Sequence, residues 1–284
     1  MTNYHILPIC ENILYGGGYM IEKGDIVVRK SYGGDLYFVV TDIDENDIVK
    51  LSCIRFRLFA DAPLEDIEKV ERDKLFEFKK LFKKDIDNKT TDILRERKER
   101  GIHYISPGKV LHIDSDEDYL NLCLNYYKRL SIPAVGKLIP EVSQPLVISE
   151  LLKEFTPDIL VLTGHDSIKK SGNFHRLEDY ASSPFFVEAV KKARQFRPSK
   201  DDLIIFAGAC QSDYENIIEA GANFASSPAR TMIHALDPVF LVERLSYTFF
   251  GTIINAEEGI SNTMTGIQGI GGIDTRGTLR RGRP

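Results

Sequence analysis

The sequence has few cysteines and no long apolar run, and both absences narrow the class of protein. Four cysteines occur in 284 residues, and none has the paired spacing of a zinc site or a disulfide framework. No run approaches the ~18–20 apolar residues that a transmembrane helix needs. Residues 1–12 lack a basic segment followed by an apolar stretch, so no secretory signal is expected. These absences predict a cytoplasmic protein without a membrane anchor.

Motifs of metal and nucleotide sites are also missing. The sequence contains neither the His-Glu-x-x-His pattern of zinc proteases nor the Gly-x-x-x-x-Gly-Lys loop that cradles phosphates. We therefore expect no metal and no other cofactor. The excess of acidic residues, 42 against 37 basic ones, argues against a nucleic-acid-binding face. Hydrophobic residues make up 43% of the chain, which is enough for a sizeable core.

Composition and periodicity divide the chain into four parts. Residues 1–70 contain short β-branched and aromatic runs between Gly/Asn/Asp turns, which predicts a small SH3-like or OB-like β-barrel domain. Residues 71–100 are densely charged with apolar residues at helical spacing, which predicts a charged helical linker. Residues 101–265 are predicted to form an α/β domain, and residues 266–284 a flexible Gly/Arg-rich tail.

The third part alternates strand and helix. Strands are expected at residues 109–113, 133–139, 159–162, 203–207 and 223–225, with helices at 117–130, 146–155, 185–196, 213–220 and 238–250. Two of the strands, 159–162 and 203–207, are apolar throughout, which is typical of buried parallel strands. The pattern predicts the α/β class, with a doubly wound, mostly parallel sheet covered by helices.

Two chemically reactive residues follow these apolar strands, His165 after the first and Cys210 after the second. Because parallel strands end at the same edge of a sheet, both side chains are expected in one crevice. If the strands are neighbours, they lie about 5 Å apart and the side chains can form a hydrogen bond. The imidazole can then take the thiol proton, and the small residues Gly208 and Ala209 let backbone N–H groups approach an oxyanion. The pair predicts acyl transfer through a thioester intermediate.

Three alternatives stay open at this point. His175, in a loop ten residues after His165, is a second candidate for the base. A glutamine-amidotransferase-like hydrolase also places a cysteine between strand and helix, but here no glycine follows Cys210-Gln211 and the histidine lies upstream. A receiver-like regulatory domain would need a phospho-acceptor such as Asp114, but the segment before it is too charged to supply the earlier strand.

The two strand-end motifs resemble those of the caspase–gingipain–separase clan of cysteine peptidases, in which the histidine also precedes the cysteine. The chain departs from the clan in one place, because Gly164 precedes His165 and Asp166 follows it. Over nearly its whole length, the chain is similar to a family of sporulation-specific cysteine proteases of endospore-forming bacteria. The segments that carry this similarity are Gly24-Asp25-Ile26-Val27, Leu162-Thr163-Gly164-His165-Asp166, Asn173-Phe174-His175, Phe206-Ala207-Gly208-Ala209-Cys210-Gln211-Ser212 and Gly221-Ala222-Asn223-Phe224-Ala225-Ser226-Ser227-Pro228.

This resemblance implies a caspase-like fold and an endopeptidase that cleaves spore coat and germination proteins after Arg or Lys. Its implied location is the mother-cell cytoplasm or the forming spore coat, with neither nucleic acid nor membrane as a partner. Cys210 would be the nucleophile, and His165 the general base and acid.

The resemblance also indicates where a basic substrate side chain would bind. In the clan, the end of the first strand often supplies the specificity pocket, so Asp114 and Asp116 are the candidate substrate-binding carboxylates. Capping of the following helix is the simpler interpretation of the same acidic residues. An Arg-directed protease would also find possible self-cleavage sites in its own tail, at Arg276, Arg280, Arg281 and Arg283.

Overall fold

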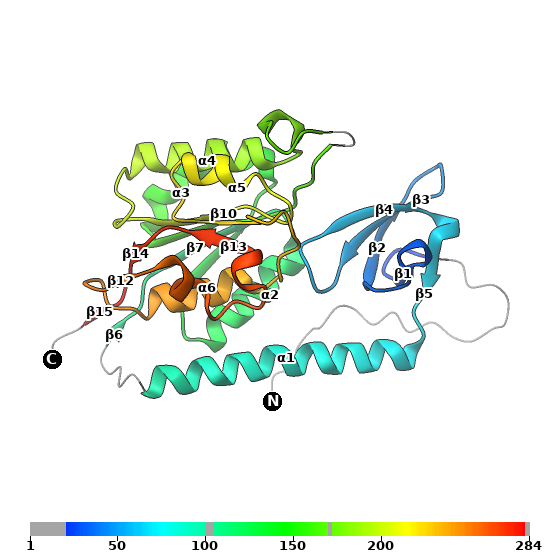
Figure 1. Cartoon of the computed structure of the whole chain (residues 1–284), viewed down its shortest axis with the longest axis horizontal. Helices are drawn as coiled ribbons and strands as arrows, with labels where there is room; N and C mark the ends of the chain where they lie inside the picture. The colour runs from blue at the N-terminus through cyan, green and yellow to red at the C-terminus, as the bar shows by residue number, and fades with distance from the viewer. Residues whose placement is uncertain (1–20, 100–104, 170–171, 282–284) are drawn as a thin grey trace. The chain divides into compact units, whose positions relative to one another are not determined.

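The chain divides into two units in the computed structural model, which describes residues 21–99, 105–169 and 172–281 (Figure 1). Unit 1 consists of the described residues up to Ile54 together with Phe59–Lys80. Unit 2 consists of Arg55–Leu58 and the chain from Leu81 onward. The four residues Arg55–Leu58 are therefore part of unit 2, although they connect two strands of unit 1 in the sequence.

Unit 1 contains a five-stranded antiparallel sheet with the strand order β4-β3-β2-β1-β5. The strands are β1 (Ile26–Arg29), β2 (Phe38–Ile43), β3 (Ile48–Cys53), β4 (Phe59–Pro63) and β5 (Ile67–Lys69). Val27, Val40 and Val49 lie on the buried face of this sheet. The predicted antiparallel pairing is confirmed, whereas closure of the sheet into an SH3-like or OB-like barrel stays a prediction. The sequence did not locate β4 and β5, because both are short and rich in acidic or exposed residues.

Helix α1 (Arg72–Glu99) is a single helix of 28 residues. Its buried residues are Ile86, Thr90 and Ile93, a narrow stripe at helical spacing. The two isoleucines belong to a core cluster of unit 2, so the predicted charged helix also contributes to packing. No helix in the described part of the chain combines the length and the apolar character needed to cross a membrane.

Unit 2 is built on a six-stranded sheet with the order β13-β11-β10-β9-β7-β8. Its strands are β7 (Val110–Asp114), β8 (Ala134–Leu138), β9 (Ile159–Leu162), β10 (Ile204–Ala207), β11 (Phe224–Ser226) and β13 (Ile270–Gly272). All pairs are parallel except the pair of β13 with β11. This agrees with the predicted mostly parallel α/β sheet.

Helices cover both faces of this sheet. They are α2 (Glu117–Arg129), α3 (Gln144–Phe155), α4 (Ser183–Phe196), α5 (Tyr214–Glu219), α6 (Asp237–Ser246) and α7 (Ala256–Ile260). Figure 1 shows α3, α4 and α5 on one face. Leu160 and Leu162 of β9 pack in the core cluster on that face, whereas Ile159 and Val161 pack in the cluster that contains residues of α2 and α6. Alternation along a strand thus fills two cores, which explains why β9 is apolar at every position.

The C-terminal segment differs from the flexible tail that the sequence predicts. Strand β13 extends the main sheet, β14 (Thr275–Arg276) pairs with β12 (Ile253–Ile254), and β15 (Arg280–Arg281) pairs with β6 (Ile105–Ser106). Three of the arginines considered for self-cleavage therefore lie in paired strands, Arg276 in β14 and Arg280 and Arg281 in β15. The side chains of Arg276 and Arg280 form ion pairs with Asp201 and Asp158. Arg283 lies outside the described residues.

The glycines of this segment permit close packing. A Cβ on Gly271 would lie 2.7 Å from the hydroxyl oxygen of Tyr214, and one on Gly272 would lie 2.3 Å from the Phe224 ring. Side chains at these positions would push β13 away from the sheet. The glycines of β13 therefore allow close packing, which the amino-acid composition by itself does not reveal.

Removing a core side chain of β9 should be costly. Leu160→Ala is expected to lower the free energy of unfolding by roughly 2–5 kcal/mol, because the deletion leaves a cavity at a fully buried site. Leu146→Ala, the same change at a site on α3 that is 73% exposed, should change it by about 0.5 kcal/mol or less. Urea unfolding followed by circular dichroism measures both values. Equal losses would contradict the central position of β9.

Candidate active site

The pairing of β9 with β10 brings the loops of His165 and Cys210 to one edge of the sheet. The two strands are parallel neighbours, and their last paired residues are Leu162 and Ala207. His165 lies three residues past Leu162, and Cys210 lies three residues past Ala207. The two residues therefore leave adjacent strands at the same level, which meets the condition set by the sequence prediction.

A hydrogen bond joins the two loops directly. Asp166, the residue after His165, accepts a hydrogen bond at 2.9 Å from the hydroxyl of Ser212, which is two residues past Cys210. The same hydroxyl oxygen accepts the N–H of Ala209 at 2.8 Å. Asp166 is buried, and it holds both strand-end loops in place. No role was predicted for Asp166 or Ser212. The available signal in the sequence is a polar residue directly after His165 and another two residues past Cys210.

Acidic and hydroxyl groups surround His165. Its backbone N–H donates to Oε1 of Glu141 at 2.6 Å, its Nδ1 lies 3.5 Å from Oγ of Ser115, and its Nε2 lies 3.6 Å from Oδ2 of Asp116. The His165 side chain is 13% exposed. Gly164 makes this close approach possible, because a Cβ there would lie 2.3 Å from the Glu141 carboxylate.

Burial sets the protonation states in this cluster. It lowers the pKa of His165 to about 3 and raises the pKa of Asp116 to about 6. At neutral pH the imidazole is therefore uncharged, while most of the Asp116 carboxyl groups are ionised. The neutral imidazole is the form that can accept a proton from a thiol.

Cys210 lies in a tight turn. Gly208 and Gln211 on either side of it have φ angles of +113° and +60°. For Gln211 this left-handed conformation is uncommon, and such conformations often occur at functional turns. The Cys210 side chain is 0% exposed, and its Sγ accepts the N–H of Ile233 at 3.3 Å. The main chain at Ile233 therefore covers the thiol in this conformation.

The other cysteines and His175 have different surroundings. Cys53 is buried in β3 of unit 1. Cys123 is buried in α2, and burial raises the pKa of its thiol to about 12, which makes it unreactive at neutral pH. His175 lies in an exposed loop, where its N–H donates to the side chain of Asn173 at 2.9 Å. Cys10 lies outside the described residues.

Asp114 ends β7 and is fully buried. Its Oδ2 accepts hydrogen bonds from the guanidinium of Arg57 and, at 2.8 Å, from the Thr163 hydroxyl. Burial by itself raises the pKa of Asp114, but the Arg57 charge and the hydrogen bonds hold it well below its usual value. Asp114 is therefore ionised and holds an arginine of its own chain. Asp116 caps α2 by accepting the Tyr119 N–H at 3.0 Å, as the capping interpretation predicted.

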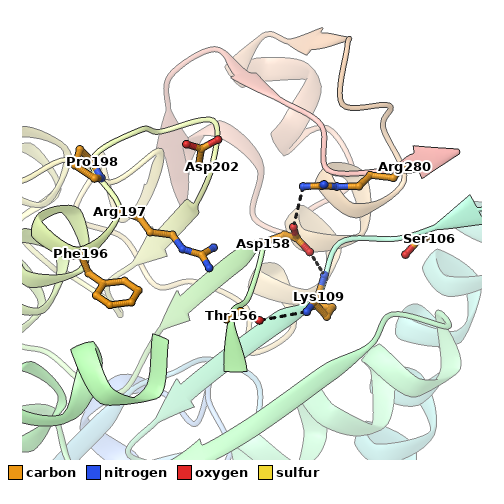
Figure 2. A pocket seen from close by; sticks show the side chains of 9 residues that line it. All are labelled: Ser106, Lys109, Thr156, Asp158, Phe196, Arg197, Pro198, Asp202 and Arg280. Atoms are coloured by element: carbon orange, nitrogen blue, oxygen red, sulfur yellow. Dashed lines mark hydrogen bonds and ion pairs between the residues drawn. The ribbon is translucent and has the colours of Figure 1, made fainter. Parts of the chain in front are cut away.

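A cavity in the described part of the chain lies away from these residues. It has a volume of about 670 Å³ and lies beside Lys109 and Asp158, which precede β7 and β9 (Figure 2). It is therefore at the amino ends of the strands, opposite to His165 and Cys210. Among residues 21–99, 105–169 and 172–281, no group of three or more His, Cys, Asp or Glu side chains is arranged to hold a metal ion.

Comparison with known proteins decides the family. The family model described as YabG peptidase U57 matches residues 22–284. The chain belongs to this family. It is also 43% identical over 281 residues to the sporulation-specific protease YabG of Bacillus subtilis (strain 168), covering 92% of this chain and 97% of that protein. The chain is therefore a protease of a sporulation family. The amidotransferase-like and receiver-like alternatives are not retained.

His234, next to Ile233, provides a test of how the site is buried. Its side chain is buried, and its Nδ1 accepts the N–H of Leu236 at 3.2 Å. Burial lowers the pKa of His234 to about 3, below its ordinary value of 6.5. Between these two pH values the unfolded chain binds a proton that the folded chain does not bind. The folded state therefore loses stability as the pH falls through this window.

His234→Asn removes the titrating group and keeps a hydrogen-bond acceptor. Between pH 7 and pH 5, the wild type should lose about 2 kcal/mol more of its free energy of unfolding than this variant loses. Urea unfolding at both pH values measures the difference. Equal losses would mean that His234 is protonated as readily in the folded state as in the unfolded one.

Proposed function

We propose that this protein is a cysteine endopeptidase in which Cys210 is the nucleophile and His165 is the general base and acid. The observation that carries the proposal is the common level of the two residues at the carboxyl ends of β9 and β10. The bond between Asp166 and Ser212 gives further support, because it joins the loops that carry the two residues.

In the proposed reaction, His165 takes the proton of the Cys210 thiol, and the thiolate attacks the carbonyl carbon of the scissile peptide bond. The turn at Gly208 to Cys210 would supply the backbone N–H groups that stabilise the oxyanion. Gly208 and Ala209 donate theirs to the Leu162 carbonyl and the Ser212 hydroxyl in this structure, so either group would have to leave that partner first. The C–N bond then breaks, the amine leaves with the proton from His165, and the acyl group stays on sulfur as a thioester. His165 next takes a proton from water, the hydroxide attacks the thioester, and the acid product leaves as the thiol reforms.

We also propose a caspase-like arrangement for unit 2, which is supported by its strand order and by its single antiparallel pair, that of β13 with β11. We propose spore coat and germination proteins as substrates, which suits a relative named as a sporulation-specific protease. The corresponding location is the mother cell or the forming spore coat. Self-cleavage in the tail stays a prediction, and it would require β14 or β15 to detach first.

We further propose that the enzyme cleaves after Arg or Lys and that Asp114 and Asp116 attract the basic side chain. Asp114 supports this proposal because its buried carboxylate already accommodates a guanidinium group, that of Arg57. Asp116 adds a second carboxylate beside His165. An arginine in such a place is stabilised by paired, charge-assisted hydrogen bonds, which a neutral side chain lacks.

The nucleophile can be tested with fluorogenic peptides that release the dye after Arg. Cys210→Ala should lower kcat/KM by about 10³-fold or more, and His165→Asn by about 10²–10⁴-fold. Cys53→Ala, which removes a buried thiol of unit 1, is the matched control and should keep the wild-type rate. Circular dichroism verifies that each variant is folded. Full activity in folded Cys210→Ala would refute the assigned nucleophile.

Specificity can be tested without changing the protein. Citrulline has nearly the shape of arginine but no charge, so a peptide with citrulline at the cleavage position should have a kcat/KM at least about 10²-fold lower. The reason is that Asp114 would be left as a buried anion without a cation. Similar kcat/KM values for the two peptides would exclude a carboxylate as the specificity group.

A further inference from the structure

The segment Arg55–Leu58 binds to unit 2 in the way an extended peptide adds a strand. The Arg57 N–H donates to the carbonyl of Ile233, and the Ala235 N–H donates to the carbonyl of Arg55, both at 3.3 Å. Phe56 and His234, which lie between these bonded positions, face each other in an antiparallel bridge. Main-chain pairing of this kind is a common mode of peptide recognition.

The strand partner of this segment also contacts the proposed nucleophile. Ile233 accepts the Arg57 N–H with its carbonyl, and its own N–H donates to Sγ of Cys210 at 3.3 Å. Arg57 and Cys210 are therefore bound to the same residue. A second peptide cannot pair with the main chain of Ile233 while Arg57 occupies it.

The Arg57 side chain fills a closed pocket with an acidic end. One guanidinium nitrogen bonds the carboxylate of Asp114, and the other donates to the Ala235 carbonyl at 3.3 Å. The guanidinium carbon lies 5.0 Å from the centre of the Tyr119 ring. Arg57 is fully buried, yet its Nε has no hydrogen-bond partner among the described residues. The pocket thus has the chemistry for an arginine side chain.

An ordinary structural ion pair would explain the burial of Arg57 and Asp114. It would not explain why the same segment pairs with the main chain that covers Cys210. Both features follow if the segment occupies the place of a substrate. Because it is part of the same chain, it would compete with substrate at an effective concentration on the order of millimolar.

We propose that Arg55–Leu58 is an internal substrate-like inhibitor. It occupies the strand position beside Ile233 and the Asp114 pocket that an arginyl protein substrate would take, and it must leave before the substrate binds. The inference rests on the proposed peptidase function, with Cys210 as the nucleophile and Asp114 as the specificity carboxylate.

The probe for this proposal is Ala-Ala-Arg-chloromethyl ketone, whose chloride is displaced as the Cys210 sulfur forms a C–S bond. Arg57→Ala should increase the rate of labelling at Cys210 by about 10-fold or more, because the competing side chain is gone. The matched control is Arg97→Ala, which removes an arginine from another ion pair of unit 2, with Glu243 at 2.9 Å. It should leave the labelling rate unchanged. Mass spectrometry of the digested protein assigns the labelled cysteine.

A folded Arg57→Ala variant that is labelled at the wild-type rate would overturn the proposal. Because this variant leaves Asp114 without its cation and can unfold, the wild type offers a second measurement. Its modification by the arginyl reagent should increase hydrogen exchange in a peptide that covers Arg55–Leu58, since the segment is displaced. Unchanged or slower exchange would overturn the inhibitor role.

These outcomes distinguish a failure of the proposed peptidase function from a failure of the inhibitor role. If Cys210→Ala keeps full peptidase activity, the proposed function fails. If Cys210→Ala is inactive but removal of Arg57 accelerates nothing and the segment stays protected, only the inhibitor role fails.

Discussion

The parallel pairing of β9 with β10 is the constraint on which the proposed site depends. Each strand buries side chains on both faces of the sheet. A shift of either strand by one residue would therefore move every side chain into the core on the opposite face. The register that places Leu162 opposite Ala207 therefore also sets the level of His165 and Cys210. The Asp166–Ser212 bond then connects the two loops beyond the sheet, where no ladder holds them. Packing in the core thus sets the strand register, and the register sets where the polar groups lie at the edge of the sheet.

Several polar side chains are buried around this edge. His112 contacts the Thr163 hydroxyl at 2.8 Å, and this hydroxyl donates to Asp114, which also holds Arg57. Buried polar groups cost free energy unless each has a partner, so a connected network of this kind specifies one arrangement of its members. The network lies next to His165 and does not include Cys210. Its members come from β7, from the end of β9 and from Arg57.

Closure of the site follows from the same contacts. Cys210 is covered by the main chain of Ile233, and Arg55–Leu58 pairs with that main chain. An internal segment with substrate chemistry would limit untimely cleavage without a second protein. Its removal would need only the exchange of one arginine for another at Asp114.

Much of unit 2 was predictable because its signals are local. The apolar runs at β9 and β10, the helical spacing in α2 and the turn residues between them depend on short segments, and these elements lie where the sequence predicts them. The candidate residues His165 and Cys210 were found for the same reason, since each follows such a run. Strand β13 was missed because its glycines allow close packing against Tyr214 and Phe224. Both of these residues are far from β13 in the sequence. Charged or short strands such as β5 were missed because pairing, not composition, makes them strands.

The sequence by itself determined the alternation of strands and helices, the apolar strands that lead to the histidine and the cysteine, and the family to which the chain is similar. Only the tertiary structure decided that Asp166 binds Ser212, that Asp114 holds Arg57, and that Arg55–Leu58 pairs beside the thiol. The physical reason is the separation in sequence over which each kind of interaction acts. Periodicity and turn chemistry act between residues a few positions apart, whereas these hydrogen bonds join residues that become neighbours only after the sheet has formed.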